Sequence, residues 1–244
     1  MKRTYLFLLT SLLAYCYLEA QIKDPKATEI WEPEPRVVTP GQHSFNPPSD
    51  AIVLLDGSNL DEWTNLEGGV PGWKLEDGGM TVVKGTGDVK TKRNFGSIQL
   101  HLEWRSPAVI EGEGQGRGNS GVFLNGIYEV QVLDSYNNRT YSNGQAASIY
   151  KQYMPLVNAC RPPGEWQTYD IIYMQPVFNK DGIKVQSGSL TVFQNGILVQ
   201  NNVEIKGTTP YIGLPQNPAH GDGPLLLQDH SNPVSYRNIW VREL

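Results

Sequence analysis

A short segment typical of a β-strand carries side chains that could do chemistry. In residues 128–134, Glu129 and Gln131 alternate with apolar residues, so a strand would place the carboxylate and the carboxamide on one face. At ~3.3 Å per residue they would lie roughly 6–7 Å apart. Arg117 and Asn119 stand just before the preceding strand-like run. We therefore interpret this face as the floor of a polar cleft and not as solvated surface.

Asp134 offers a second carboxylate in the same segment. It has the wrong parity to share a face with Glu129, and would join it only if a β-bulge intervened near residues 132–133. With that bulge, Glu129 and Asp134 would resemble the paired carboxylates that glycoside hydrolysis requires.

Gln228 and His230 bring similar chemistry to the end of another apolar run, residues 225–227. An imidazole titrates near neutral pH and can remove a weakly acidic proton, although a lone histidine is more often structural. Glu129, Asp134 and His230 could also hold a divalent metal ion, because such ions accept carboxylate and imidazole ligands. The spacing of these residues leaves the cofactor unknown.

Trp166 precedes the strand-like run 168–174. Its ring could stack on a sugar, or it could pack at the rim of a β-sandwich. The long connection 139–159 contains Tyr141, Tyr150 and Tyr153, and connections of this length in compact domains are commonly functional.

The elements that must position these residues are short strands. Apolar or alternating runs of strand length recur from residue 51 onward, and no helix longer than a turn or two is predicted. Asn125-Gly126 and Asn195-Gly196 predict tight hairpins, because both residue types tolerate positive φ. The pattern predicts an all-β fold, an antiparallel two-sheet sandwich of the jelly-roll type. The predicted strands cover residues 51–55, 73–75, 80–83, 97–104, 120–124, 128–133, 168–174, 189–194, 197–199, 225–228 and 235–243.

The chain divides into three parts. Residues 1–20 have the charges and apolar stretch of an export signal, which predicts an exported and, in a host with two membranes, periplasmic protein. An alternative is a lipoprotein anchored through Cys16. Residues 21–49 are rich in proline and predict an extended linker or strap. Residues 50–244 form the β-sandwich domain, and Cys160, its lone cysteine, excludes a disulfide framework.

Charge narrows the classes of partner. The net charge is −5 with acids and bases interspersed, so no basic stripe is present and a nucleic acid partner is not expected. Beyond the signal, no segment is apolar enough to cross a membrane. The oligomeric state is not indicated.

Taken in order, several motifs resemble the 3-keto-disaccharide hydrolase family, which has a concanavalin A-like sandwich. The resemblance covers roughly residues 50–244, and its motifs are Val53-Leu-Leu-Asp-Gly-Ser-Asn-Leu-Asp-Glu-Trp63, Gly118-Asn-Ser-Gly-Val-Phe123, Tyr128-Glu-Val-Gln-Val-Leu-Asp134, Gly164-Glu-Trp-Gln167, Gln194-Asn-Gly196, Leu227-Gln-Asp-His-Ser231 and Tyr236-Arg-Asn-Ile239. The stretch 215–224 is longer than the connections common in that family, which predicts a changed pocket.

The resemblance implies an oligosaccharide or glycoside substrate oxidised at C3. The C3 carbonyl acidifies the C2–H bond, so a base can start elimination of the C1 aglycone, and water then adds to the enone. Our hypothesis makes His230 the base and Glu129 the acid or a metal ligand. Arg117, Asn119 and Gln131 would then hold substrate oxygens, and Gln228 and Trp166 would complete the sugar pocket.

Two other functions fit the same residues. A retaining glycoside hydrolase would use Glu129 and Asp134 on unoxidised glycosides. A carbohydrate-binding sandwich would bind sugar without turnover, because this architecture serves lectins and enzymes alike.

Overall fold

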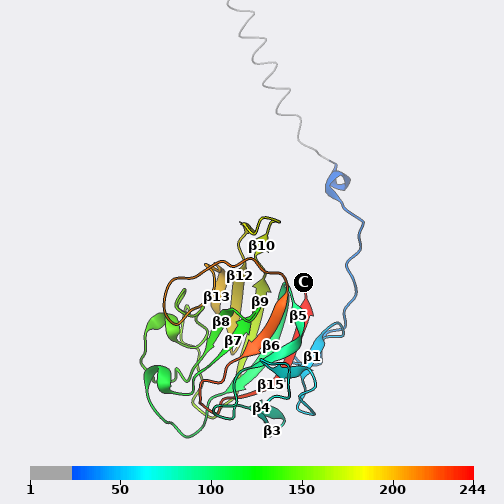
Figure 1. The fold of residues 1–244 in the computed structure, drawn as a ribbon. Helices are drawn as coiled ribbons and strands as arrows, with labels where there is room; N and C mark the ends of the chain where they lie inside the picture. Colours follow the sequence, from blue (N-terminus) through cyan, green and yellow to red (C-terminus); the bar gives the residue numbers. More distant parts are fainter. Residues whose placement is uncertain (1–23) are drawn as a thin grey trace, which may run out of the picture. The chain divides into compact units, whose positions relative to one another are not determined.

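A computed structural model describes residues 24–244, and these divide into a short N-terminal unit, up to Val37, and a second unit, Val38–Leu244 (Figure 1). The predicted export signal and Cys16 lie outside the described residues. In the first unit, the 3-10 helix η1 (Pro25–Thr28) begins after Asp24, whose carboxylate accepts the Lys26 N–H at 3.0 Å.

The second unit is built from two antiparallel sheets and one small hairpin. The eight-stranded sheet has the order β13-β12-β9-β6-β15-β4-β3, with β1 also paired to β15. Its strands are β1 (Ile52–Leu55), β3 (Lys74–Glu76), β4 (Gly79–Thr81), β6 (Ile98–Arg105), β9 (Gln167–Met174), β12 (Ser189–Gln194), β13 (Ile197–Glu204) and β15 (Ser235–Glu243).

The five-stranded sheet has the order β2-β5-β14-β7-β8, which leaves β8 at one edge. Its strands are β2 (Trp63–Asn65), β5 (Val89–Phe95), β7 (Ser120–Leu124), β8 (Tyr128–Val132) and β14 (Gly223–Leu227). The hairpin pairs β10 (Val177–Phe178) with β11 (Lys184–Gln186), and 3-10 turns η2 (Gly114–Gly116) and η3 (Ser142–Gly144) lie in the loops. The predicted all-β, two-sheet antiparallel sandwich is confirmed.

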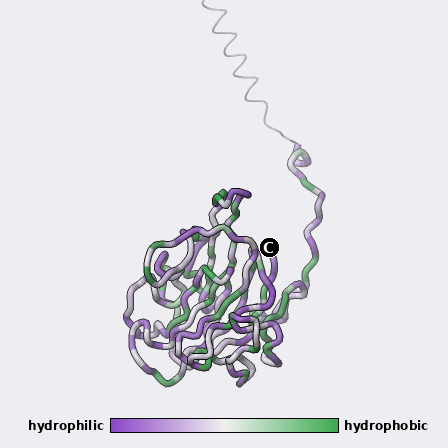
Figure 2. Tube along the Cα trace, in the orientation of Figure 1, coloured by the Kyte–Doolittle hydropathy of each residue, from purple (hydrophilic) through white to green (hydrophobic). Residues whose placement is uncertain are grey.

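The core lies between the two sheets. Residues of opposite hydropathy alternate along the strands (Figure 2), and the inward set includes Leu102, Trp104, Val122 and Val130, all fully buried. Tyr169 and Tyr236 of the large sheet also reach across the core. The Tyr169 hydroxyl donates to the Gln131 carbonyl at 2.7 Å, and that of Tyr236 donates to Ser120 Oγ at 2.7 Å.

Both predicted hairpins are confirmed, with Asn125, Gly126, Asn195 and Gly196 all at positive φ. The sequence pattern missed β2, β5, β10 and β11. In β5 the reason is chemical: its run Val-Lys-Thr-Lys-Arg-Asn-Phe has five polar residues at its centre, and of these only Thr91 is buried.

Residues 38–50 lie along the large sheet within the second unit. The Phe45 carbonyl accepts hydrogen bonds from Asn238 and from Trp240, and Arg242 forms an ion pair with Asp50 at 2.8 Å. Within residues 24–244, no helix is long and apolar enough to cross a membrane.

Candidate functional site

A cavity of about 280 Å³ lies over the outward face of β7 and β8, on the opposite side of the small sheet from the core. Strand register explains its floor: Phe123 is paired with Glu129, and Gly121 with Gln131, so these residues share one face. The cavity is lined by Asn119, Phe123, Glu129, Gln131, Tyr150, Thr209, Tyr211, Gln228 and His230. Residues of the segments 119–131 and 228–230 therefore line one cavity, whereas Arg117 does not line it.

Two loops cover the free edge of β8 and fix the backbone of Glu129. The Tyr150 N–H donates to the Glu129 carbonyl at 3.1 Å, and the Glu129 N–H donates to Thr209 Oγ1 at 3.1 Å. Next to them, the Gln131 N–H donates to the Ser148 carbonyl at 3.0 Å. An edge strand that would otherwise expose its peptide groups is thus paired, and both loops add a side chain to the cavity.

The Glu129 carboxyl group is a buried acid in the cavity. Glu129 is only 5 % exposed. Burial, with a smaller contribution from the Asp88 charge, raises the pKa of Glu129 to about 8. Glu129 is therefore protonated at neutral pH, the state that a general acid needs.

Gln131 can partner Glu129 in either protonation state. With its NH2 turned toward an ionised Glu129, the amide donates to Oε1 at 2.7 Å and to the Ser120 carbonyl at 3.0 Å. When Glu129 is protonated, the carboxyl proton can be donated to the amide oxygen across the same contact. The amide NH2 then donates to Gln115 Oε1 at 3.0 Å. The Gln131 amide can thus contact the Glu129 carboxyl group in both protonation states.

Glycine at position 121 makes room for this carboxyl group. A Cβ at residue 121 would lie 2.6 Å from Glu129 Oε1 and 2.7 Å from a ring carbon of Phe123. Any larger residue would displace one of the two side chains.

Asp88, which was not predicted from the sequence, lies near Glu129 and His230. Leu227 of β14 is paired with Val89 of β5, and continuing that register puts Asp88 beside Gln228. Burial raises the pKa of Asp88, while the backbone N–H of Asp229 (2.8 Å from Oδ1) and the nearby His230 imidazole oppose the rise. Asp88 is therefore a charge partner within electrostatic reach of both Glu129 and His230.

Asp229 does not pair with His230. Its Oδ2 accepts the N–H groups of Gly85 and Gly87 at 2.8 and 3.1 Å, which anchors that turn. His230 itself is exposed at the cavity wall. The imidazole can therefore reach a bound molecule from solvent.

Arg117 and Asp134 lie outside the Glu129 cavity and pair with each other. Arg117 Nε and Asp134 Oδ2 are 2.7 Å apart, with the side chains 12 % and 3 % exposed. Both line a neighbouring cavity of about 320 Å³. The bulge that would have turned Asp134 toward Glu129 is absent, because β8 pairs regularly up to Val132 and ends there.

Trp166 lies beside the large sheet. It precedes β9, and the guanidinium groups of Arg105 and Arg237 lie over its ring, at 4.6 and 4.1 Å from the ring centre. Arg237 in turn forms an ion pair with Glu103 at 2.7 Å on the outward face of the large sheet. Trp166 therefore does not contribute to the pocket that contains Glu129.

The described residues do not fit the three-residue metal site. Asp134 is engaged by Arg117 and faces a different cavity from Glu129 and His230. Within residues 24–244, no group of three or more His, Cys, Asp or Glu side chains has a metal-holding arrangement.

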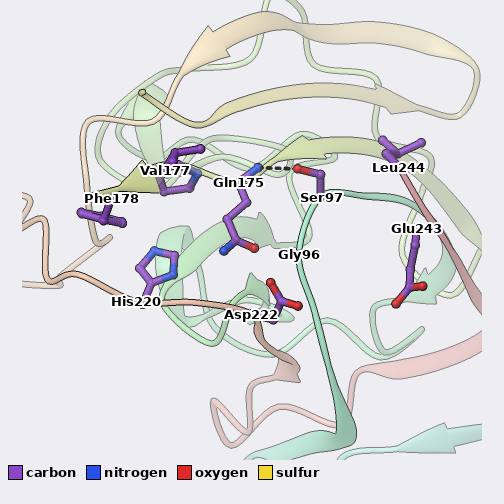
Figure 3. Close-up of a pocket in the computed structure, with 10 residues that line it drawn as sticks. Gly96, Ser97, Gln175, Val177, Phe178, His220, Asp222, Glu243 and Leu244 are labelled. Atoms are coloured by element: carbon purple, nitrogen blue, oxygen red, sulfur yellow. Dashed lines mark hydrogen bonds between the residues drawn. The ribbon is translucent and has the colours of Figure 1, made fainter. Parts of the chain in front are cut away.

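A larger cavity, of about 590 Å³, lies between the β10 hairpin and the segment 220–222 (Figure 3). Gln175, His220 and Asp222 point into it, and His220 Nε2 lies 2.7 Å from the Tyr128 hydroxyl. Its carboxylates, Asp222 and Glu243, are exposed. Neither carboxylate is buried, whereas the smaller cavity contains the buried Glu129, so we place the chemistry in the smaller cavity.

Phe123, Tyr150, Thr209 and Tyr211 were not predicted as site residues. The length of the connection 139–159 was a usable signal for Tyr150. This connection is a loop, and it contributes the Tyr150 side chain to the cavity. Tyr211 carried no such signal, because nothing in its own segment shows which strand it covers.

Comparisons with known proteins found domains that are similar to this chain. A family of domains described as 3-keto-alpha-glucoside-1,2-lyase-like matches residues 50–242. A proposed glycosyl hydrolase from Parabacteroides distasonis is 53 % identical, with 91 % of this chain and 97 % of that chain covered and a TM-score of 0.87.

Two further proposed glycosyl hydrolases from the same organism share the fold. One is 21 % identical with a TM-score of 0.57, covering 80 % of this chain and 94 % of that one. The other is 22 % identical with a TM-score of 0.54, covering 80 % and 99 %. A comparison with curated proteins found no match.

The Arg117–Asp134 pair generates a first prediction. Asp134→Asn leaves a buried guanidinium without its counter-charge, so we expect the free energy of unfolding to fall by about 3–5 kcal/mol in denaturant titrations. Unchanged stability in this variant would contradict the structural role given to the Arg117–Asp134 pair.

Glu129 generates a second prediction. Its pKa of about 8 lies above the ordinary value of 4.5, so between these pH values the folded state binds more protons than the unfolded state. Stability should therefore decrease as pH rises from about 5 to 8, by at most roughly 1.4 kcal/mol per pH unit. Chemical denaturation at several pH values measures this slope, and Glu129→Gln should flatten it. An unchanged slope in that variant would show that another group titrates.

Proposed function

Since the chain belongs to the 3-keto-alpha-glucoside-1,2-lyase-like family, we propose that it cleaves glycosides oxidised at C3, by elimination followed by hydration. The single observation that carries the proposal is a buried Glu129 with a pKa of about 8 in the same cavity as an accessible His230. A proton donor and a proton acceptor for one sugar ring are thus available together.

In the first half-reaction, His230 removes the C2 proton, and the electron pair is delocalised onto the C3 oxygen. The enolate then re-forms the carbonyl with a C1–C2 double bond and breaks the bond between C1 and the aglycone oxygen. Glu129 gives its proton to that oxygen. The Asp88 carboxylate stabilises the imidazolium that His230 has become.

In the second half-reaction, water adds across the C1–C2 double bond. The oxygen of the water bonds to C1 while ionised Glu129 accepts a proton from that water. His230 then returns a proton to C2. Both groups regain their starting states, and the product is the free 3-keto sugar. Gln131 donates to Glu129 while the carboxylate is ionised.

Sugar oxygens would be held by the amides at the cavity floor and wall, those of Asn119, Gln131 and Gln228. Arg117 is assigned no substrate contact, because its Nε pairs with Asp134 and its NH2 group donates to the Tyr136 carbonyl at 3.0 Å. We also propose that the protein acts after export, because residues 1–20 resemble an export signal.

A pair of substrates tests the proposed reaction. The protein should release the aglycone from a chemically prepared 3-keto-glucoside and leave the parent glucoside intact, as measured by chromatography of both products. Cleavage of the parent glucoside with a trapped covalent intermediate would instead indicate a retaining hydrolase. Binding of the 3-keto-glucoside in calorimetry without any turnover would indicate a carbohydrate-binding protein.

Glu129→Gln tests the assigned acid. Loss of the proton donor should lower kcat on a 3-keto-glucoside with an alkyl leaving group by about 10²–10⁴-fold. In the unaltered protein, kcat/KM should fall above pH 8, as Glu129 ionises. Glu76→Gln, at an exposed position of β3, is the matched control and should retain full turnover. Full turnover by Glu129→Gln would remove the role given to this residue.

A further inference from the structure

The loop that carries Tyr211 has an exposed and apolar tip. Its sequence from residue 210 to 215 is Pro-Tyr-Ile-Gly-Leu-Pro, and Tyr211, Ile212 and Leu214 are 72 %, 82 % and 79 % exposed. The base of the loop is closed by two hydrogen bonds between Thr208 and Gln216, of 2.8 and 3.0 Å. Consecutive large apolar side chains held in water by an ordered loop indicate a binding surface.

The tip is attached to the site. Thr209, two residues before Tyr211, accepts the Glu129 N–H at 3.1 Å and donates to the Ile127 carbonyl at 3.2 Å. Tyr211 itself lines the cavity that contains Glu129. The apolar tip therefore begins where the proton donor of the proposed reaction is held.

Lys151 fixes the Tyr211 ring from the other loop. Its ammonium group donates to the Tyr211 carbonyl and lies 4.4 Å from the centre of that ring. The same ammonium lies 5.7 Å from the ring centre of Tyr141 and 5.6 Å from that of Tyr150. Tyr141 and Tyr150 are joined by a hydroxyl–hydroxyl hydrogen bond of 2.7 Å. The Lys151 cation thus contacts three aromatic rings, and two of them, Tyr150 and Tyr211, line the cavity.

We propose that Tyr211 and Ile212 form a subsite for an apolar aglycone, an aryl or alkyl group bonded to C1 of the substrate. This inference rests on the proposed function. The amides that suit a polyhydroxylated ring line the same cavity, at Asn119, Gln131 and Gln228. The tip contains no carboxylate or amide, so a second sugar would find few hydrogen-bond partners there, whereas a hydrocarbon group would be removed from water.

Benzyl and methyl 3-keto-glucosides test the subsite, because the two leaving alcohols have similar acidity and differ mainly in apolar area. The unaltered protein should prefer the benzyl substrate by about tenfold or more in kcat/KM. In Tyr211→Ala this preference should fall about tenfold, chiefly through a higher KM for the benzyl substrate, since the lost contact exists before and during the reaction. Ile183→Ala, at another exposed aliphatic position, is the matched control and should keep the full preference.

Lys151 supplies a second test that leaves the ring in place. Lys151→Met should reduce the benzyl preference because Tyr211 is no longer held, and Lys151→Arg should restore it by supplying another cation. If Lys151→Met keeps the full preference for the benzyl substrate, the contact between Lys151 and Tyr211 does not position the Tyr211 ring.

Other outcomes separate the subsite from the reaction. If no 3-keto-glucoside is cleaved, the proposed function fails. If both are cleaved with equal kcat/KM, only the subsite fails. If Tyr211→Ala weakens turnover of a 3-keto-disaccharide as much as that of the benzyl substrate, the wall is a platform for sugars and the apolar assignment is wrong.

Discussion

The burial of one carboxyl group on the outward face of the small sheet is the constraint on which the site depends. An outward face of an antiparallel sheet normally meets water, and a glutamate there ionises at its ordinary pKa. Here, Glu129 is covered by loops from two distant parts of the chain, so burial raises its pKa to about 8. The acid chemistry therefore comes from what covers β8 as much as from β8 itself.

The fold and the site share these covering loops. β8 lies at the edge of its sheet, and its peptide groups at Glu129 are satisfied by Tyr150 and Thr209. The residues that complete the sheet edge are thus the ones that close the cavity. Lys151 then joins the two loops through Tyr211. A change in either loop would alter both the protonation of Glu129 and the shape of the wall.

Local periodicity predicted what depends on a single strand. It placed Glu129 and Gln131 on one face and marked both hairpins, because these features follow from alternation and turn chemistry. It could not reveal Asp88, which reaches the site through pairing of β5 with β14, more than a hundred residues apart in sequence. Nor could it exclude a bulge at Asp134; only the regular pairing up to Val132 and the buried contact with Arg117 do so.

The site depends on the absence of a side chain at Gly121. Its hydrogen leaves the space that Glu129 Oε1 and the Phe123 ring occupy. In sequences related to this one, we expect the pair formed by this glycine and this glutamate to be inherited together. Where an alanine or serine replaces the glycine, the acid should have moved or disappeared, so position 121 could sort active relatives from those that only bind sugar.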